Sequence, residues 1–198
     1  CYRQQHSKAA PTVLIPNALK AEHPGTWARR GNTFTFLNVT IDTKGSWFPP
    51  QVNRLWLFNL HYFDWLFGIA SVKKYEAYIS DWITHVPIRM ADSWHPYTIS
   101  QRTSNWIWTY PRFAGALSDG FNNRYFDSLY NQLRFLNHHV EYDVLGNHLI
   151  ANCRALIVGG VFFGNQRWIR KGQHLLRQQL REQILSDGGH YERSPMYH

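Results

Sequence analysis

The residues of this chain that could do chemistry gather in two stretches near its C-terminal end. One is Gly146-Asn147-His148, which opens an apolar run, and the other is the segment 187–198, which begins with an Asp-Gly-Gly turn. The second stretch holds five ionisable side chains within nine residues: His190, Glu192, Arg193, Tyr197 and His198. A phenol between cationic neighbours has its phenolate form favoured, so a group with a reference pKa of about 10 exchanges protons nearer neutrality. The segment is therefore a candidate for proton transfer, with a tyrosine anchored at a loop end as the structural alternative.

Two interpretations of Asn147-His148 stay open. Asn is a good residue for capping a helix, so the pair fits a helix start with a satisfied histidine. Equally, an amide donor and an imidazole near the positive end of a helix are suited to bind and neutralise a substrate carboxylate. The pair alone does not decide between capping and catalysis.

Metal and cofactor binding lack sequence support. The chain has 11 histidines, but none forms an H-x-x-x-H or H-E-x-x-H pair, and the adjacent His138 and His139 point to different helix faces. Its two cysteines, Cys1 and Cys153, supply no C-x-x-C motif. A G-x-S-x-G elbow, a P-loop and a dinucleotide fingerprint are also lacking. We predict neither a metal nor a cofactor.

The composition favours a negatively charged partner with flat faces. Lys and Arg number 21 against 13 Asp and Glu, for a formal charge of +8, and aromatic residues make up 16% of the chain. Such a balance suits nucleic acid, an anionic membrane or an acidic polysaccharide, while a solvated basic surface is the plain alternative. The basic residues form no Lys/Arg run, which disfavours nucleic acid. No apolar run reaches the roughly 20 residues of a membrane span.

The elements that must position these residues are mainly helical. Residues 1–31 indicate an irregular arm, and the alternation over 33–41 predicts a strand or hairpin. Helical periodicity then predicts helices at 55–67 and 73–85, a third that starts after Pro96 and is interrupted at Pro111, and three more at 124–142, 148–163 and 166–185. Short turns between them imply antiparallel neighbours, in a bundle or a ring of hairpins. We divide the chain into an arm, 1–54, and a helical domain, 55–198.

Four segments of the sequence together resemble one known family, the heparinase II/III-like polysaccharide lyases, which are related to toroid-type alginate lyases. They are LFNLHYFDWL (57–66), WHPYTISQRTSNWIW (94–108), GNHLIANCRAL (146–156) and DGGHYERSPMYH (187–198). The resemblance implies an all-α fold, an incomplete (α/α) toroid of antiparallel helical hairpins with a small N-terminal β element. It also implies that the chain is a fragment: a β-sandwich domain, absent here, would follow the toroid, and the acidic polysaccharide would bind between the two.

The resemblance assigns the family's functional residues to this chain at the positions where its motifs match. The family's Asn matches Asn147, the neighbouring His of alginate-lyase relatives matches His148, and the catalytic Tyr matches Tyr197, with His198 beside it. A second base would lie beyond His198. For the substrate-binding wall we expect the remaining polar and aromatic residues of these motifs: Trp94, His95, Arg102, Asn105, His190, Glu192 and Arg193. The resemblance favours a bacterial periplasmic or secreted location, although no signal peptide opens the chain.

The implied reaction explains these residue types. Removing the C5 proton of a uronate gives a carbanion, which needs its carboxylate neutralised by Asn147 together with either a histidine or an arginine such as Arg102. A tyrosine then protonates the leaving glycosidic oxygen, or takes the C5 proton of one substrate epimer. The reaction consumes no water and needs no paired carboxylates. We therefore expect β-elimination of a uronate-containing polysaccharide. A non-catalytic carbohydrate-binding or scaffold toroid is the alternative, and a helical module for nucleic acid is the third and weaker one.

Overall fold

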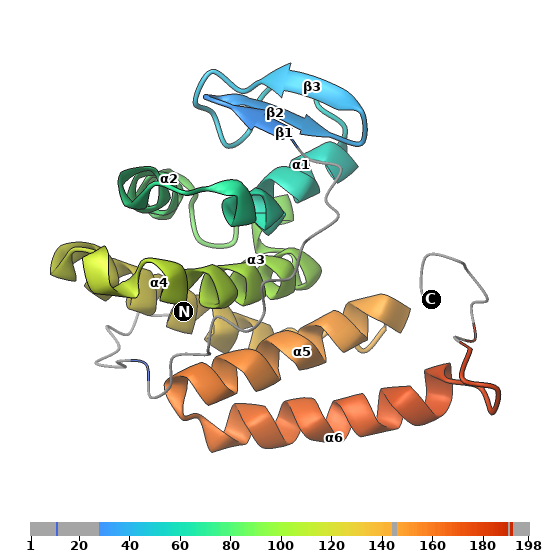
Figure 1. Cartoon of the computed structure of the whole chain (residues 1–198). Coiled ribbons are helices and arrows are strands. Elements are labelled where there is room, and N and C mark those ends of the chain that lie inside the picture. Colours follow the sequence, from blue (N-terminus) through green and yellow to red (C-terminus); the bar gives the residue numbers. More distant parts are fainter. Residues whose placement is uncertain (1–10, 12–27, 144–145, 190, 192–198) are drawn as a thin grey trace.

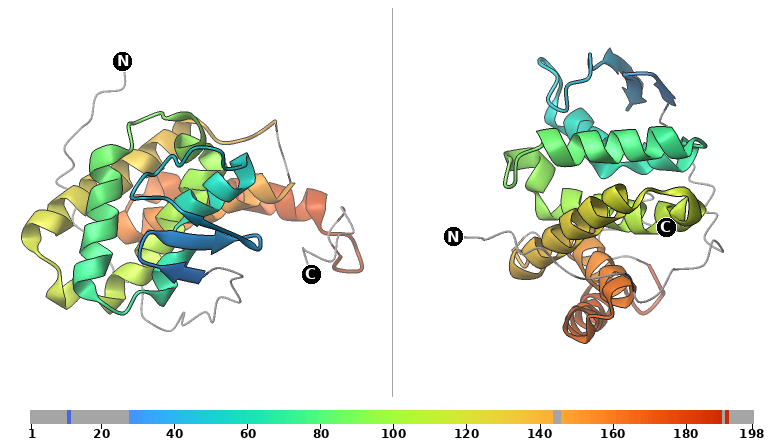
Figure 2. Two further views of the ribbon diagram at one scale, coloured as in Figure 1. Left: turned by 90° about the horizontal axis from the view of Figure 1, so that it is seen from above. Right: turned by 90° about the vertical axis from the view of Figure 1, so that its left-hand side faces the viewer.

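The computed structural model describes residue 11 and residues 28–143, 146–189 and 191. Its elements stack in layers from a small sheet at one end, through α1 and α2, then α3 and α4, to the α5–α6 hairpin at the other end (Figures 1 and 2). Helices dominate every layer except the first. The predicted all-α class with a small N-terminal β element is confirmed.

The sheet contains three antiparallel strands in the order β1-β2-β3: Ala28–Arg30, Thr33–Phe36 and Val39–Asp42. Leu37 and Asn38 join β2 to β3 with φ of 54° and 61°, as a two-residue hairpin turn requires. The predicted hairpin in 33–41 is therefore present, and β1 extends it. The strand β1 was not predicted, because three residues are too few to show alternation.

The sheet packs on the first helical layer through aromatic rings. Phe36 meets Trp56 edge to face with centroids 5.0 Å apart, and Phe34 meets Trp65 at 5.2 Å. Both phenylalanines are buried and belong to the same apolar core as the helices. The division at residues 54 and 55 stays a prediction, and the strands on its N-terminal side share a core with α1.

The helices lie close to where periodicity predicted them. Asn53, Ser71, Ser118 and Asn165 cap the first, second, fourth and sixth through side-chain oxygens that accept backbone N–H bonds. Ser118 starts the fourth helix five residues before the predicted position. The α-helices are α1 Arg54–Tyr62, α2 Val72–His85, α3 Pro96–Thr109, α4 Asp119–His138, α5 Gly146–Phe163 and α6 Gln166–Gln183. Short 3-10 turns cover Asp64–Gly68, Ala91–Trp94, Tyr110–Arg112 and Ala114–Ala116.

The predicted helix 55–67 is broken at Phe63, whose φ is 63°. The break is stabilised from α3: Asn105 Nδ2 donates to the Tyr62 carbonyl (2.9 Å), and Arg102 Nη1 donates to the His61 carbonyl (3.3 Å). The last carbonyls of a helix have no partner within the helix, so these two side chains satisfy the end of α1. Helix α1 therefore stops at Tyr62, and a 3-10 turn replaces its expected last turn.

Helix α3 occupies the middle of the molecule, and α1, α4 and α5 pack around it. Ten of its residues are buried, including Arg102, Asn105 and Trp106. Helix α6 packs along α5, where the two backbones approach so closely that a Cβ on Gly172 would lie 2.9 Å from the Cys153 carbonyl oxygen. Among the described residues, no helix is both long and apolar enough to cross a bilayer.

Candidate functional site

The carboxylate of Glu141 lies at the centre of a polar cluster between the start of α3 and the start of α5. Its residue is only 8% exposed, although it precedes α5 in a connecting segment. One oxygen, Oε1, lies 3.1 Å from His148 Nδ1 and 3.7 Å from His95 Nε2. Two half-exposed imidazoles therefore meet at one buried carboxylate.

Asn152 fixes the position of this carboxylate. Its Oδ1 accepts from the Glu141 backbone N–H (3.0 Å), and its Nδ2 donates both to Glu141 Oε2 (3.1 Å) and to Ser100 Oγ (3.0 Å). Asn152 is fully buried on α5, and Ser100 is buried on α3. An amide inside an apolar helix needs such partners, because an unpaired buried polar group is costly.

These bonds determine the tautomer of His148. An ionised carboxylate only accepts hydrogen bonds, so the 3.1 Å contact requires that His148 Nδ1 carries the proton. The other ring nitrogen, Nε2, is then the one left to meet a ligand as an acceptor, or as a donor when the ring is charged. Glu141 thus orients His148 as a partner carboxylate orients a catalytic histidine.

Aromatic rings extend the cluster into a partly exposed surface. The Tyr97 ring stacks on the His148 imidazole with centroids 4.3 Å apart, and Tyr62 meets Tyr97 edge to face at 5.7 Å. Phe58 lies 5.6 Å from the His95 ring, between centroids. We call these five half-buried residues, Phe58, Tyr62, His95, Tyr97 and His148, the aromatic surface. Flat faces with polar edges are suited to contact sugar rings.

The electrostatics of this surface keep its phenols protonated. Burial raises the pKa of Tyr97, and the charges of Asp64 and Glu141 add to that shift, while a hydrogen bond with Gln101 and the charge of Arg154 oppose it. Burial likewise raises the pKa of Tyr62 above its usual range. Both hydroxyls therefore act as neutral hydrogen-bonding groups near pH 7. For His95, burial lowers the pKa, and the Glu141 charge opposes this.

Arg154 supplies a cation beside the aromatic surface. Its Nη2 donates to Gln101 Oε1 at 2.6 Å, and its guanidinium carbon lies 5.3 Å from the centre of the Trp108 ring. Burial lowers its pKa from the ordinary arginine value, and the nearby Tyr97 and Asp64 act in the opposite direction. The side chain is thereby fixed on α5, six residues along the helix from His148.

Of the residues predicted to act on substrate, Asn147 and His148 lie in the first turn of α5, which already includes Gly146. Gly146 has a φ of 58°, a conformation that favours glycine. Both side chains are half-buried at this end of α5, and His95 joins His148 through their rings, 6.1 Å apart between centroids. Asn147 is therefore the second residue of α5, whereas a capping residue would precede the helix.

Three other predicted substrate contacts, Trp94, Arg102 and Asn105, are buried. Arg102 is fully buried, with its Nε donating to Gln132 Oε1 (2.7 Å), its Nη1 donating to the Ser93 carbonyl (2.9 Å), and its guanidinium 4.1 Å from the Trp82 ring centre. Asn105 is bonded to the Tyr62 carbonyl and to Asp64. Trp94 is 6% exposed and packs edge to face on Phe135. These contacts support a structural role for the three residues, and their contact with substrate stays a prediction.

The second predicted stretch lies almost wholly outside the described residues. It contains His190, Glu192, Arg193, Tyr197 and His198, so their approach to His148 stays a prediction. Sequence reasoning missed Glu141 and Asn152. A signal for Asn152 existed, because a polar amide in the apolar run of α5 must find a buried partner.

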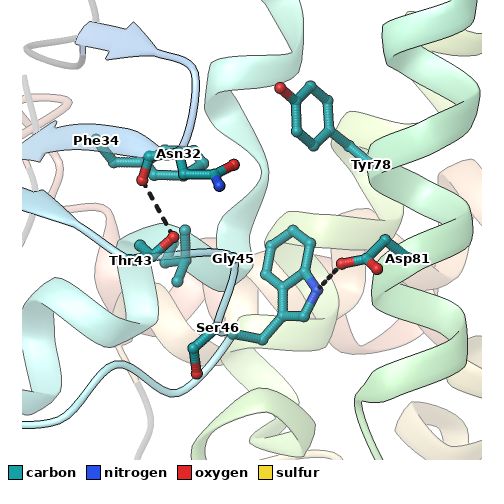
Figure 3. A pocket seen from close by; sticks show the side chains of 9 residues that line it. Asn32, Phe34, Thr43, Gly45, Ser46, Tyr78 and Asp81 are labelled. Carbon is teal, nitrogen blue, oxygen red and sulfur yellow. Dashed lines mark hydrogen bonds between the residues drawn. The ribbon is translucent and has the colours of Figure 1, made fainter.

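Outside this cluster, a small pocket lies between the sheet and α2 (Figure 3). Its main polar contact is the indole Nε1 of Trp47, which donates to Asp81 Oδ2 at 2.8 Å. Thr43 Oγ1 closes another side by donating to the Asn32 carbonyl at 3.1 Å. The Trp47–Asp81 bond joins the segment after β3 to α2, and the pocket lining shares no residue with the aromatic surface. Among the described residues, no three His, Cys, Asp or Glu side chains form a metal-binding group.

Comparison with known proteins places this chain in a family. The model of the family described as Heparinase II/III N-terminus matches residues 68–198. The chain belongs to this heparinase II/III family. The predicted family is thereby confirmed, and the helical hairpins are those of its incomplete toroid.

Curated relatives are named as lyases. The chain is 27% identical over 186 residues to a heparin-sulfate lyase of Pedobacter heparinus, covering 83% of this chain and 28% of that protein. A heparin-sulfate lyase of Bacteroides stercoris is 31% identical over 61 residues, which cover 29% of this chain and 9% of that protein. The chain thus spans less than a third of the length of these relatives.

Solved structures share the fold. The crystal structure of heparan sulfate lyase HepC from Pedobacter heparinus matches with a TM-score of 0.65 and 22% identity, covering 80% of this chain and 28% of that one. A heparinase III gene product matches with a TM-score of 0.64 and 18% identity, covering 80% of this chain and 30% of that one. At this identity the matches show the fold alone.

Proposed function

We propose that this chain is the N-terminal toroid part of a lyase that cleaves an acidic, uronate-containing polysaccharide by β-elimination. The observation that carries the proposal is the buried Glu141 carboxylate bonded to His148 at 3.1 Å, next to the aromatic surface at the first turn of α5. The chain also belongs to a family whose curated relatives are named heparin-sulfate lyases. A heparin-like polymer is accordingly the first substrate to test.

In the proposed reaction, a base removes the C5 proton of the uronate, and the electron pair forms a C4–C5 double bond as the C4–O bond breaks. The leaving oxygen takes a proton from Tyr197. Asn147 and His148 stabilise the charge that grows on the uronate carboxylate, with help from the positive end of α5. His198 lies beside Tyr197 in the sequence, and both roles come from the family resemblance. The reaction needs no cofactor.

The aromatic surface would bind the sugars next to the bond that breaks. Tyr97 and Tyr62 offer ring faces and neutral hydroxyl groups, and His95 offers an edge. We assign Trp94, Arg102 and Asn105 to the scaffold that fixes α1 against α3. His190, Glu192 and Arg193 stay predicted substrate contacts.

The remaining parts of the proposal concern the longer protein. The chain spans 28% of the Pedobacter heparinus relative, which leaves room for a β-sandwich domain that closes the cleft. We propose that residues 1–54 form the arm and residues 55–198 the toroid part of that protein. A periplasmic or secreted location fits an enzyme whose substrate is an extracellular polysaccharide.

The test is turnover by the full-length protein. Incubation with heparin, heparan sulfate or alginate should raise the ultraviolet absorbance of the unsaturated product, and the isolated chain 1–198 serves as a comparison for the fragment's own activity. Binding of these polymers without any absorbance change would favour the alternative, a non-catalytic carbohydrate-binding toroid. That alternative draws on the same aromatic surface, which needs no catalytic group to hold a sugar.

A further inference from the structure

Helix α6 carries a straight row of basic side chains. These residues recur every three or four positions and are all exposed: Arg167, Arg170, His174, Arg177 and Arg181. With a rise of about 1.5 Å per residue, the row is about 21 Å long. We call it the basic stripe. Residues three and four apart lie on one face of a helix, so the stripe is a continuous surface.

The stripe faces away from the rest of the described molecule. Helix α6 packs on α5 through buried residues at a similar spacing, among them Trp168, Leu175 and Gln179. At 3.6 residues per turn, the stripe lies about half a turn from this packed face. Figure 1 and the right-hand view of Figure 2 place α6 at the outer end of the stack, with α5 on its inner side.

The charge of the stripe is not balanced within the described part of the chain, where none of its members has an ion-pair partner. The one acidic residue of α6, Glu182, accepts a hydrogen bond from Gln179 Nε2 at 2.9 Å. Like charges three or four residues apart destabilise a helix. An anionic ligand along the stripe would relieve this repulsion.

Aromatic rings accompany the charges at the first turn of α6. An open groove there is lined by Arg167 and Arg170 together with Tyr130 and Phe163, whose rings meet edge to face with centroids 5.4 Å apart. Guanidinium groups next to ring faces suit a ligand that is both anionic and built of rings. A polysaccharide bearing acidic groups has this chemistry.

A later segment of the same protein could also pack on α6, but it would fit another side of the helix. Leu180 and Ile184 are 46% and 39% exposed and continue a row with the partly buried Ile169 and Leu176. This apolar row lies about a quarter turn from the stripe. Apolar surface is what a following helix would bury, so the continuing toroid should cover the apolar row and leave the stripe open.

We propose that the basic stripe is a second binding surface for the linear acidic polysaccharide, separate from the candidate catalytic site. Gln183 Nε2 donates to the Gly146 carbonyl at 3.1 Å, which joins the Arg181 end of the stripe to the first turn of α5. The stripe therefore starts at the end of the hairpin that carries Asn147 and His148 and leads away from it. A long polymer held at both places would bind more tightly than a short one. The inference rests on the proposed function.

The test compares two triple variants of the full-length protein. Arg170→Gln/Arg177→Gln/Arg181→Gln removes three charges from the stripe. The control, Lys44→Gln/Lys73→Gln/Lys74→Gln, removes three exposed charges from the turn after β3 and from α2. KM is measured for long heparin and for a heparin tetrasaccharide. The stripe variant should raise KM for the polymer about tenfold and leave kcat/KM for the tetrasaccharide unchanged, with less than about a twofold change in the lysine variant.

Direct binding of heparin at several salt concentrations gives a second readout. Loss of three charge contacts should lower the slope of log affinity against log salt by roughly 2 to 3. Equal effects in both variants, or unchanged polymer binding, would overturn the proposal. A stripe variant with a lower Tm and unchanged polymer kinetics would also overturn it, because the stripe would then be an internal interface. A stripe variant that lost binding of single-stranded DNA but not of heparin would overturn it as well. If the wild type turns over neither substrate, the proposed function fails, and heparin binding still tests the stripe.

Discussion

His148 Nδ1 lies 3.1 Å from Glu141 Oε1, and the second oxygen of the same carboxylate accepts from Asn152 Nδ2. The carboxylate thus accepts from two donors at once. A glutamine has only one acceptor oxygen, and Asn152 is fixed by its bonds to the Glu141 backbone N–H and Ser100. When glutamine replaces Glu141, its single oxygen can therefore face either Asn152 or His148, and its NH₂ group faces the other.

Glu141→Gln should switch the tautomer of His148. The glutamine oxygen should face Asn152, so its NH₂ group faces His148 Nδ1 and requires an acceptor there, which moves the ring proton to Nε2. Nitrogen-15 NMR of labelled histidine reads this directly, and kcat should fall at least about tenfold, because Glu141 no longer orients the His148 ring that is proposed to stabilise the uronate carboxylate. Glu182→Gln is the matched control. An unchanged His148 tautomer in the folded variant would contradict the positioning role.

The sequence was informative about the helices and the motif at Asn147, and much less so about the support of the site. Periodicity located the six helices because apolar residues recur at helical spacing along each of them. It missed the break at Phe63, because the groups that stabilise it, Arg102 and Asn105, lie some forty residues later. The same two residues were predicted to contact substrate, since their chemistry is readable from the sequence and their burial is not. Arginine is seldom fully buried, and only the packing of α3 shows this one to be.

His61 should make the fold less stable in acid. Burial, followed by the charge of Arg102, lowers the pKa of His61 to about 3, and its Nδ1 accepts from Trp82 Nε1 at 3.0 Å. Its pKa in the unfolded chain is about 6.5, so between pH 6.5 and 3 only the unfolded state takes up the proton. This contribution is complete above pH 6.5 and falls by about 2–3 kcal/mol by pH 4.5.

Urea denaturation of wild type, His61→Asn and His138→Asn at pH 7 and pH 4.5 measures this effect. His61→Asn keeps an acceptor near Trp82 and removes the titrating group, so its loss of stability between the two pH values should be smaller by about 2–3 kcal/mol. His138 is exposed on α4 and serves as the control. The same pH dependence in all three proteins would show that another group is responsible.

The close packing of α5 and α6 should be sensitive to a single methyl group at Gly172. A Cβ there would lie 2.7 Å from Ile157 Cγ1 and 2.9 Å from the Cys153 carbonyl oxygen. Gly172→Ala should therefore lower the free energy of unfolding by about 1–3 kcal/mol, although alanine favours helices. Gly120→Ala on α4, where nothing lies within 4 Å, should raise it by about 0.5–1 kcal/mol. Chemical denaturation compares the pair, and a stabilising Gly172→Ala would mean that the hairpin is packed more loosely.

In the full-length protein, Tyr197→Phe should abolish elimination and leave polysaccharide binding largely intact. The substitution removes the hydroxyl that moves the proton and keeps the ring. Asn147→Ala should instead weaken transition-state stabilisation by about 2–4 kcal/mol, the size of the effect when one donor to a developing negative charge is lost. Kinetics on both variants, with circular dichroism to confirm folding and heparin affinity to measure binding, separates the two roles. Near-normal turnover by a folded Tyr197→Phe protein would make this tyrosine structural, and it would direct the search for the proton donor to the phenols of Tyr62 and Tyr97, which burial keeps protonated.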